Sequence, residues 1–98
     1  MARPELLEQI YTIVAQIPEG RVTTYGRVAK MTEGATPRMV GSAMGRLPSG
    51  HGLPWHRVIN SSLKVTEHGG AVRQREKLRA EGVAFDARGR INPELLWP

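Results

Sequence analysis

The feature that most restricts the fold is a predicted helix over residues 37–47 that is nearly bare of side chains on one face. Apolar residues recur along it at the i, i+3, i+4, i+7 spacing of a buried helix face, namely Val40, Ala43, Met44 and Leu47. The opposite face carries Arg38, Gly41, Ser42 and Gly45. Because a glycine inside a helix costs roughly 1 kcal/mol relative to alanine, two of them on one outward face require a reason. Close approach to a groove of DNA, with Arg38 projecting into it, is one explanation. Tight packing against another helix is the alternative.

A second, shorter helix is predicted just before this one. Thr24 is a suitable N-cap for an apolar pattern that begins at Tyr25. Gly34 then breaks the chain, and Thr36 followed by Pro37 is a typical start for the next helix. Two short helices joined by a turn that contains glycine form a helix-turn-helix.

The remaining elements complete the predicted fold. An apolar stripe from Leu6 to Ile17 at helical spacing predicts a helix, and residues 71–81 predict another that ends at Gly82. The segments at residues 58–59 and 64–66 are predicted to pair as a small hairpin. The sequence therefore predicts an α+β, mostly α fold. It would be a small single domain over residues 1–98, with a winged-helix-like helix-turn-helix and a short β-hairpin.

The charge of the chain is concentrated in its middle. The net charge is +5 over 98 residues, and residues 21–57 hold six basic residues against one acidic residue, Glu33. This pattern fits either a polyanionic partner or general solubility. The sequence has neither a long apolar run nor a charged and apolar leader, so we expect a cytoplasmic protein that does not enter the membrane.

The sequence shows no constellation of catalytic or metal-binding residues. It contains no cysteine, which excludes disulfides, thiolate metal ligands and a thiol nucleophile. His51, His56 and His68 lack the spacing of metal ligands, and Ser61 and Ser62 lack a motif that would activate them. We therefore expect a binding protein with no metal, no cofactor and no catalytic residue.

The residues Pro-Trp-His-Arg-Val at positions 54–58 carry a specific resemblance. They resemble the Pro-Cys-His-Arg-Val motif in the DNA-binding domain of the O6-alkylguanine-DNA alkyltransferases, with Trp55 in place of the cysteine that accepts the alkyl group. The tryptophan form is typical of the alkyltransferase-like proteins, which bind the damaged base without repairing it. Further segments in the family's order are Ile17-Pro18-Glu19-Gly20, Val22-Thr23-Thr24-Tyr25-Gly26, Arg38-Met39-Val40-Gly41, Glu81-Gly82 and Trp97-Pro98.

The resemblance implies a role for individual residues. Arg38 would enter the base stack in the space left by the flipped nucleotide, and Tyr25 would press on the phosphate beside it. Trp55 would wall the pocket for the base, and the backbone of Trp55 and Val58 would bond the guanine edge. The implied DNA-binding residues are Tyr25, Arg38, Gly41, Ser42 and Gly45. The implied lesion pocket consists of Tyr25, Trp55, Val58, Val65 and His68.

Each of these roles has a structural alternative. Tyr25 and Trp55 are aromatic residues that could simply belong to the core. His56, Arg57 and Glu81 match residues that activate the cysteine in the alkyltransferases. Without a thiol to activate, we interpret these three as mainly a structural hydrogen-bond set.

Two positions depart from the pattern of the alkyltransferases. Leu47 stands where they usually have an asparagine that braces the helix-turn-helix. In the loop 67–70 this chain has Glu-His-Gly-Gly, where related proteins often carry a lysine or arginine that caps the alkyl pocket. His68 is the nearest basic candidate in that loop.

The resemblance thus implies a monomeric protein that docks in the minor groove of double-stranded DNA containing O6-alkylguanine. It would flip the base, hold it without dealkylation and flag it for nucleotide excision repair proteins. A helix-turn-helix transcriptional regulator without lesion specificity is the alternative. Arg38 is the only long side chain on the bare face, which disfavours base-by-base readout. A glycosylase is disfavoured because no carboxylate lies near Trp55 in sequence.

Overall fold

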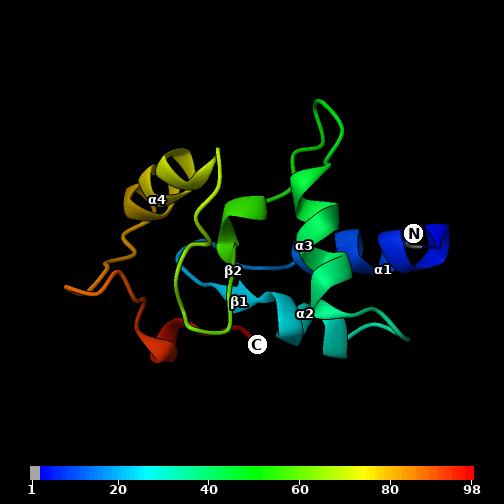
Figure 1. Cartoon of the computed structure of the whole chain (residues 1–98), viewed down its shortest axis with the longest axis horizontal. Coiled ribbons are helices and arrows are strands. Elements are labelled where there is room, and N and C mark those ends of the chain that lie inside the picture. The colour runs from blue at the N-terminus through cyan, green and yellow to red at the C-terminus, as the bar shows by residue number, and fades with distance from the viewer. Residues whose placement is uncertain (1–2) are drawn as a thin grey trace.

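The protein is described by a computed structural model that covers residues 3–98 (Figure 1). In chain order its elements are α1 (Pro4–Val14), β1 (Thr23–Thr24), α2 (Tyr25–Lys30), α3 (Pro37–Gly45), the 3₁₀ turn Trp55–Arg57, β2 (Val58–Ile59), α4 (Ala71–Ala80) and the 3₁₀ turn Pro93–Leu95. The predicted α+β, mostly helical class is confirmed. Residues 1 and 2 of the predicted domain lie outside the described residues. None of the helices in residues 3–98 is long and apolar enough to cross a lipid bilayer.

The helix-turn-helix forms as the capping residues predict. Thr24 Oγ1 accepts a hydrogen bond from the N–H of Arg27 at 3.1 Å. Thr36 Oγ1 accepts one from the N–H of Met39 at 3.2 Å. Each bond satisfies a backbone donor that the first turn of a helix leaves without a partner. α3 ends at Gly45, slightly before the predicted end at Leu47, because Leu47 precedes a proline and such residues avoid helical backbone angles.

The predicted hairpin is wrong, because β2 pairs with β1 in parallel instead. Thr23 lies opposite Val58, and Thr24 lies opposite Ile59. The chain does reverse after Asn60, whose N–H donates to the carbonyl of Lys64 at 3.0 Å and whose side-chain oxygen accepts the N–H groups of Ser62 and Lys64, but no strand pairing of the two predicted segments continues beyond this turn. Lys64 then pairs with Arg90 of the C-terminal segment.

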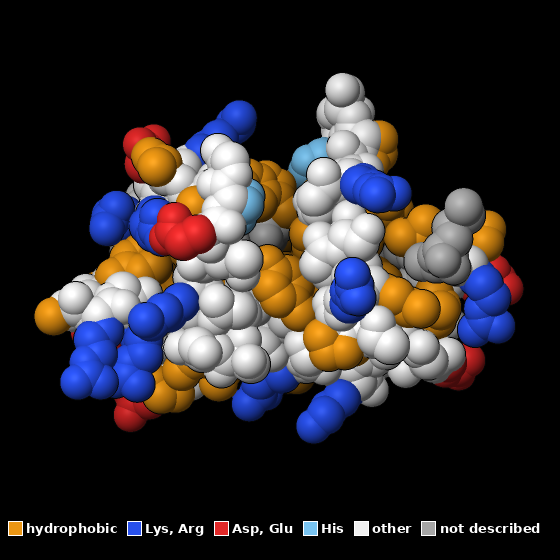
Figure 2. Space-filling model, viewed as in Figure 1, with side chains coloured by type: hydrophobic (Ala, Val, Ile, Leu, Met, Phe, Trp, Pro, Cys, Tyr) orange, Lys and Arg blue, Asp and Glu red, His pale blue; other side chains and the backbone are white. Residues whose placement is uncertain are grey.

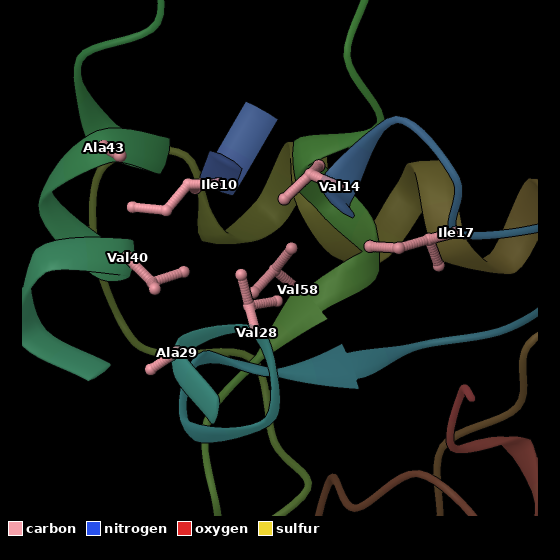
Figure 3. Packing of buried hydrophobic residues seen from close by; sticks show 8 residues of the cluster. All are labelled: Ile10, Val14, Ile17, Val28, Ala29, Val40, Ala43 and Val58. Atoms are coloured by element: carbon pink, nitrogen blue, oxygen red, sulfur yellow. The ribbon is translucent and has the colours of Figure 1, made fainter. Parts of the chain in front are cut away.

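Two apolar clusters lie on either side of this two-stranded sheet. The first lies beneath the helix-turn-helix, where side chains from α1, α2, α3 and β2 point toward one another (Figure 3). It comprises Ile10, Val14, Ile17, Val28, Ala29, Val40, Ala43 and Val58. The second joins α4 to the C-terminal segment and comprises Val22, Ile59, Val65, Ala71, Leu78, Val83 and Ile91. Successive residues of a strand point to opposite faces, so Val58 and Ile59 tie the two clusters together.

Candidate nucleic-acid interface

A hollow opens between α3 and the segment that leads into α4, and Trp55 forms part of its wall. Figure 2 shows apolar side chains in the recess between these two parts of the molecule. The cavity volume is about 350 Å³, within the roughly 300–1,000 Å³ of small-molecule sites. We call it the Trp55 hollow, and it is lined by Tyr25, Gly41, Met44, Gly45, Trp55, Val58, Thr66, His68 and Gln74.

Volume alone does not single out the Trp55 hollow. Another hollow of about 440 Å³ lies beside Phe85 and Ile91, and none of the predicted site residues lines it. The Trp55 hollow differs because residues far apart in the chain converge there, from the start of α2, the bare face of α3, the 3₁₀ turn and α4. Four of the five predicted lesion-pocket residues line it: Tyr25, Trp55, Val58 and His68.

Val65 is the predicted lesion-pocket residue that the structure places elsewhere. Its side chain is 4% exposed and belongs to the second apolar cluster. Its neighbour Thr66 lines the hollow instead. The segment is extended, so adjacent side chains point in opposite directions and only one of the two can face the hollow.

The bare face of α3 is open to solvent. A Cβ atom placed on Gly45 would meet nothing within 4 Å, and one on Gly41 would meet only Tyr25, at 3.9 Å. Neither glycine is therefore needed to pack α3 against another helix of residues 3–98, and that alternative is wrong. Open space at both positions leaves room for a second molecule to approach the helix backbone.

α3 forms a ridge between two hollows, which divides the five predicted DNA-binding residues. Gly41, Gly45 and Tyr25 face the Trp55 hollow. Arg38 and Ser42 line a second hollow of about 430 Å³ on the α1 side of α3, which we call the Arg38 hollow. It is lined by Leu7, Tyr11, Thr36, Arg38, Met39, Ser42, Ala43 and Arg46. Four of the predicted residues thus lie on the two flanks of α3, and Tyr25 lies at the start of α2, so the five do not share a single pocket.

Tyr25 combines the two roles that the sequence left open. It is the first residue of α2 and is partly buried against the first apolar cluster. It also lines the Trp55 hollow. Its ring is therefore both a core contact and a wall of the site.

The surface around α3 is basic. Arg27, Lys30, Arg38 and Arg46 are exposed, and none of these four forms an ion pair within residues 3–98. Figure 2 shows basic side chains over α3. Such a surface attracts a polyanion through long-range electrostatics.

A backbone hydrogen bond and a ring contact position Trp55. Its N–H donates to the carbonyl of Leu53 at 2.8 Å as the 3₁₀ turn begins. Its ring meets the ring of His56 edge to face, with 6.0 Å between the centroids. The ring is only partly buried, so Trp55 is more than a core residue: part of its surface faces the hollow.

The carboxylate of Glu81 gathers three segments behind the 3₁₀ turn. It accepts hydrogen bonds from the N–H of Gly20 at 2.9 Å, from Arg57 Nη2 at 2.8 Å and from His56 Nε2 at 2.6 Å. Arg57 also donates through Nη1 to the carbonyl of Ile17 at 2.8 Å. We call these residues the Glu81 clamp. They form the structural hydrogen-bond set that the sequence predicted.

The clamp shifts the ionisation of two of its members. Burial raises the pKa of Glu81, but the hydrogen bonds from Arg57, Gly20 and His56 outweigh it and bring the pKa down to about 2. Burial lowers the pKa of His56 below its usual 6.5, although Glu81 acts in the opposite direction. The clamp is therefore a carboxylate that accepts from a guanidinium and a neutral imidazole.

Sequence reasoning missed three residues of the Trp55 hollow: Met44, Thr66 and Gln74. Gln74 is the most informative, because its side chain is 2% exposed. The available signal was its spacing, since it shares a helix face with Ala71 and Leu78, both buried apolar residues. A polar residue on a buried face has to be hydrogen-bonded there, which marks it as a positioned group.

The family described as 6-O-methylguanine DNA methyltransferase, DNA binding domain, matches residues 5–83. A "DNA base-flipping protein" of Vibrio parahaemolyticus is 46% identical over 89 residues, covering 89% of this chain and 89% of the relative. "Alkyltransferase-like protein 1" of Schizosaccharomyces pombe is 35% identical over 106 residues, covering 99% and 98%.

A solved structure agrees with these sequence matches. The crystal structure of S. pombe Atl1 in complex with damaged DNA containing O6-carboxymethylguanine superposes with a TM-score of 0.84 at 34% identity. The match covers 100% of this chain and 99% of that one. The similarity therefore extends over the helix-turn-helix, the 3₁₀ turn and α4 together.

Proposed function

The chain belongs to the family of the 6-O-methylguanine DNA methyltransferase DNA-binding domain, among its alkyltransferase-like members, and from this premise we propose that it binds O6-alkylguanine in duplex DNA. It would turn the damaged base out of the stack and hold it in the Trp55 hollow. The observation that carries the proposal is the hollow itself, which lies directly beside the open face of α3.

The open face of α3 supplies the docking surface of this proposal. With no side chain at Gly41 or Gly45, the helix backbone can approach the floor of the narrow minor groove. Arg38 is exposed on the same helix and is free to enter the stack where the base has left. Tyr25 stands between the docking helix and the hollow, where it can press on the phosphate beside the target.

The damaged base is easier to extrude than an intact one. Flipping a nucleotide costs a few kcal/mol, and less where pairing is already weakened, as in an alkylated pair. The Trp55 ring and the apolar side chains of Met44 and Val58 offer the extruded base a surface that replaces its lost stacking. We therefore expect the protein to bind more tightly to duplexes whose damaged base pair opens more easily.

The protein would hold the alkyl group without removing it. Alkyl transfer needs a thiolate, and the sequence contains no cysteine, with Trp55 standing at the position that the resemblance assigns to the nucleophile. His56 Nε2 is bonded to Glu81 within the clamp. The bound lesion would then be passed to nucleotide excision repair proteins, as the resemblance implies.

The proposal is tested by binding to two duplexes that differ in one group. Fluorescence anisotropy at fixed salt compares a duplex with one O6-methylguanine with the same duplex carrying guanine, because affinity depends steeply on salt. We expect the methylated duplex to bind at least ~10-fold more tightly, since its pair opens at lower cost. Equal affinity for both duplexes would favour the transcriptional-regulator alternative.

The non-catalytic part of the proposal has its own readout. After incubation with excess methylated duplex, the intact mass of the protein should be unchanged and the methyl group should remain on the DNA. A gain of one methyl group on any residue would overturn it.

A further inference from the structure

Gln74 is a buried amide whose orientation is fixed by its neighbours. Its side-chain nitrogen lies 3.2 Å from the carbonyl oxygen of His56 and 3.0 Å from that of Val58. Carbonyl oxygens can only accept, so this atom is the NH₂ group, and both of its hydrogens are used. The amide oxygen therefore faces the opposite way, toward His68, where it lies 3.1 Å from Nε2.

The protonation of His68 follows from its two partners. Gly70 presents its backbone N–H to Nδ1 at 3.0 Å. A backbone N–H can only donate, so Nδ1 carries no hydrogen. The oxygen of Gln74 can only accept, so Nε2 carries the hydrogen and donates it. These two partners fit the His68 tautomer with its hydrogen on Nε2, because a hydrogen on Nδ1 would point at the N–H of Gly70.

The ring of His68 lies close to Gly70. A Cβ atom on Gly70 would fall 2.9 Å from His68 Cε1, so a side chain at residue 70 would require this exposed ring to shift. Both ring nitrogens are bonded within the protein and neither is left for a ligand. His68 therefore does not act as the cation that related proteins often carry in this loop.

The other residues that line the Trp55 hollow carry no charged side chain. No Asp, Glu, Lys or Arg is among the residues that line it within residues 3–98. Of the charged residues close to His68 in the chain, Glu67 pairs with Arg75, and Arg73 lines a separate hollow with Lys77 on the other side of Trp55. Arg57 is engaged by Glu81 in the clamp. The hydroxyls of Tyr25 and Thr66 can donate a hydrogen bond but carry no charge.

We propose that the Trp55 hollow selects uncharged O6-alkyl groups on guanine and discriminates against alkyl groups that end in a carboxylate, with His68 and Gln74 as the residues that set this specificity. The proposal rests on the proposed function. A carboxylate that enters the hollow leaves water and meets no cation, and such burial is costly unless the charge is paired. A methyl group loses nothing on entering the same space.

The test uses three duplexes of one sequence, carrying guanine, O6-methylguanine or O6-carboxymethylguanine, at fixed salt. We expect wild type to bind the carboxymethyl duplex ~10-fold or more weakly than the methyl duplex. His68→Lys places a cation at the hollow and should raise affinity for the carboxymethyl duplex selectively, so that the gap closes to within ~3-fold. The matched control is Ser62→Lys, which adds the same charge at an exposed position away from the hollow and should shift all three duplexes equally.

A second measurement checks the protonation without DNA. ¹⁵N NMR of the imidazole rings distinguishes a bare ring nitrogen from a protonated one. We expect His68 to show a bare Nδ1 and a protonated Nε2 at neutral pH, and Gln74→Leu, which removes the acceptor, to abolish that fixed tautomer.

The outcomes separate this inference from the function on which it rests. Equal or tighter binding of the carboxymethyl duplex, with both lesions preferred over guanine, overturns the inference and leaves lesion binding intact. A doubly protonated His68 at neutral pH overturns it as well. If neither lesion is preferred over guanine, both the inference and the proposed function are wrong.

Discussion

Replacing Glu81 with glutamine tests whether the clamp is structural. Glutamine keeps the size of the side chain but removes its charge, so Glu81→Gln mimics the protonated carboxyl. Three donor groups converge on that carboxylate, from Gly20, His56 and Arg57. The amide can serve only part of them, because one of its two oxygen acceptors becomes an NH₂ donor.

The size of the effect can be worked from the pKa of Glu81. A pKa lowered from 4.5 to about 2 corresponds to at most ~3 kcal/mol of stabilisation by the ionised form. The side chain keeps 11% of its surface exposed, and salt screens it in part, so we expect about 2–3 kcal/mol at pH 7. In urea, with a slope of about 1–1.5 kcal/mol per molar, the unfolding midpoint falls by about 2 M.

The pH dependence gives this prediction its sign. Because the folded pKa lies below the unfolded one, the stabilisation is present above pH 4.5 and is lost as the pH falls toward 2. Wild type should therefore approach the variant in acid, and the gap should shrink to about 1 kcal/mol at pH 3. Glu76→Gln is the matched control, since Glu76 is exposed on α4, the helix that ends just before Glu81, and it should change the stability by less than about 0.5 kcal/mol. Equal midpoints for Glu81→Gln and wild type at pH 7, or a gap that stays constant to pH 3, would refute the reasoning.

Three further substitutions test the site. Arg38→Ala should weaken binding to the methylated duplex by about 1–3 kcal/mol, measured by anisotropy, because it removes the side chain that fills the stack. Arg88→Ala, which also removes an exposed arginine, should weaken binding much less. Similar losses from both variants would show that Arg38 contributes only its positive charge. Gly41→Leu should stabilise α3 by up to about 0.5–1 kcal/mol, measured by thermal unfolding, because leucine is the better helix former. The same variant should lose binding to plain and alkylated duplexes alike. Unimpaired binding would exclude docking of DNA on the open face of α3. Trp55→Cys should lower the free energy of unfolding by about 2–3 kcal/mol, less than the loss of a fully buried tryptophan, because Trp55 is only partly buried. Its new thiol should accept alkyl groups slowly or not at all, as followed by the intact mass of the protein. Rapid transfer would show that His56 remains positioned for catalysis.

Much of the helical scaffold could be predicted from local signals. Thr24 and Thr36 cap the helices that they were expected to cap, because a side-chain oxygen before an apolar helix pattern has few other uses. The open face of α3 could also be predicted, from the glycines at positions 41 and 45. These features depend on residues close together in the chain.

Features set by distant residues could not be predicted in the same way. The partner of β2 is β1, 35 residues earlier by the pairing of Thr23 with Val58, and no local pattern indicates a parallel pair of that separation. Val65 was assigned to the lesion pocket by resemblance alone, and only the path of the extended chain decides that its neighbour Thr66 faces the hollow instead. Gln74 matters because of the carbonyl groups that surround it, and these are brought to it by folding.

The central claim is that the damaged base enters the Trp55 hollow, and the fluorescence of Trp55 reports on this directly. The chain has two tryptophans, and Trp97 lies in the C-terminal segment against the first apolar cluster, so Trp97→Phe leaves Trp55 as the single tryptophan, which is excited selectively at a wavelength that tyrosine does not absorb. On titration with the O6-methylguanine duplex, the Trp55 emission should be strongly quenched as the base packs against the ring, and the guanine duplex at equal occupancy should change it much less. If both duplexes bind and quench Trp55 equally, or if neither alters its emission, the base does not enter the hollow and the account is wrong.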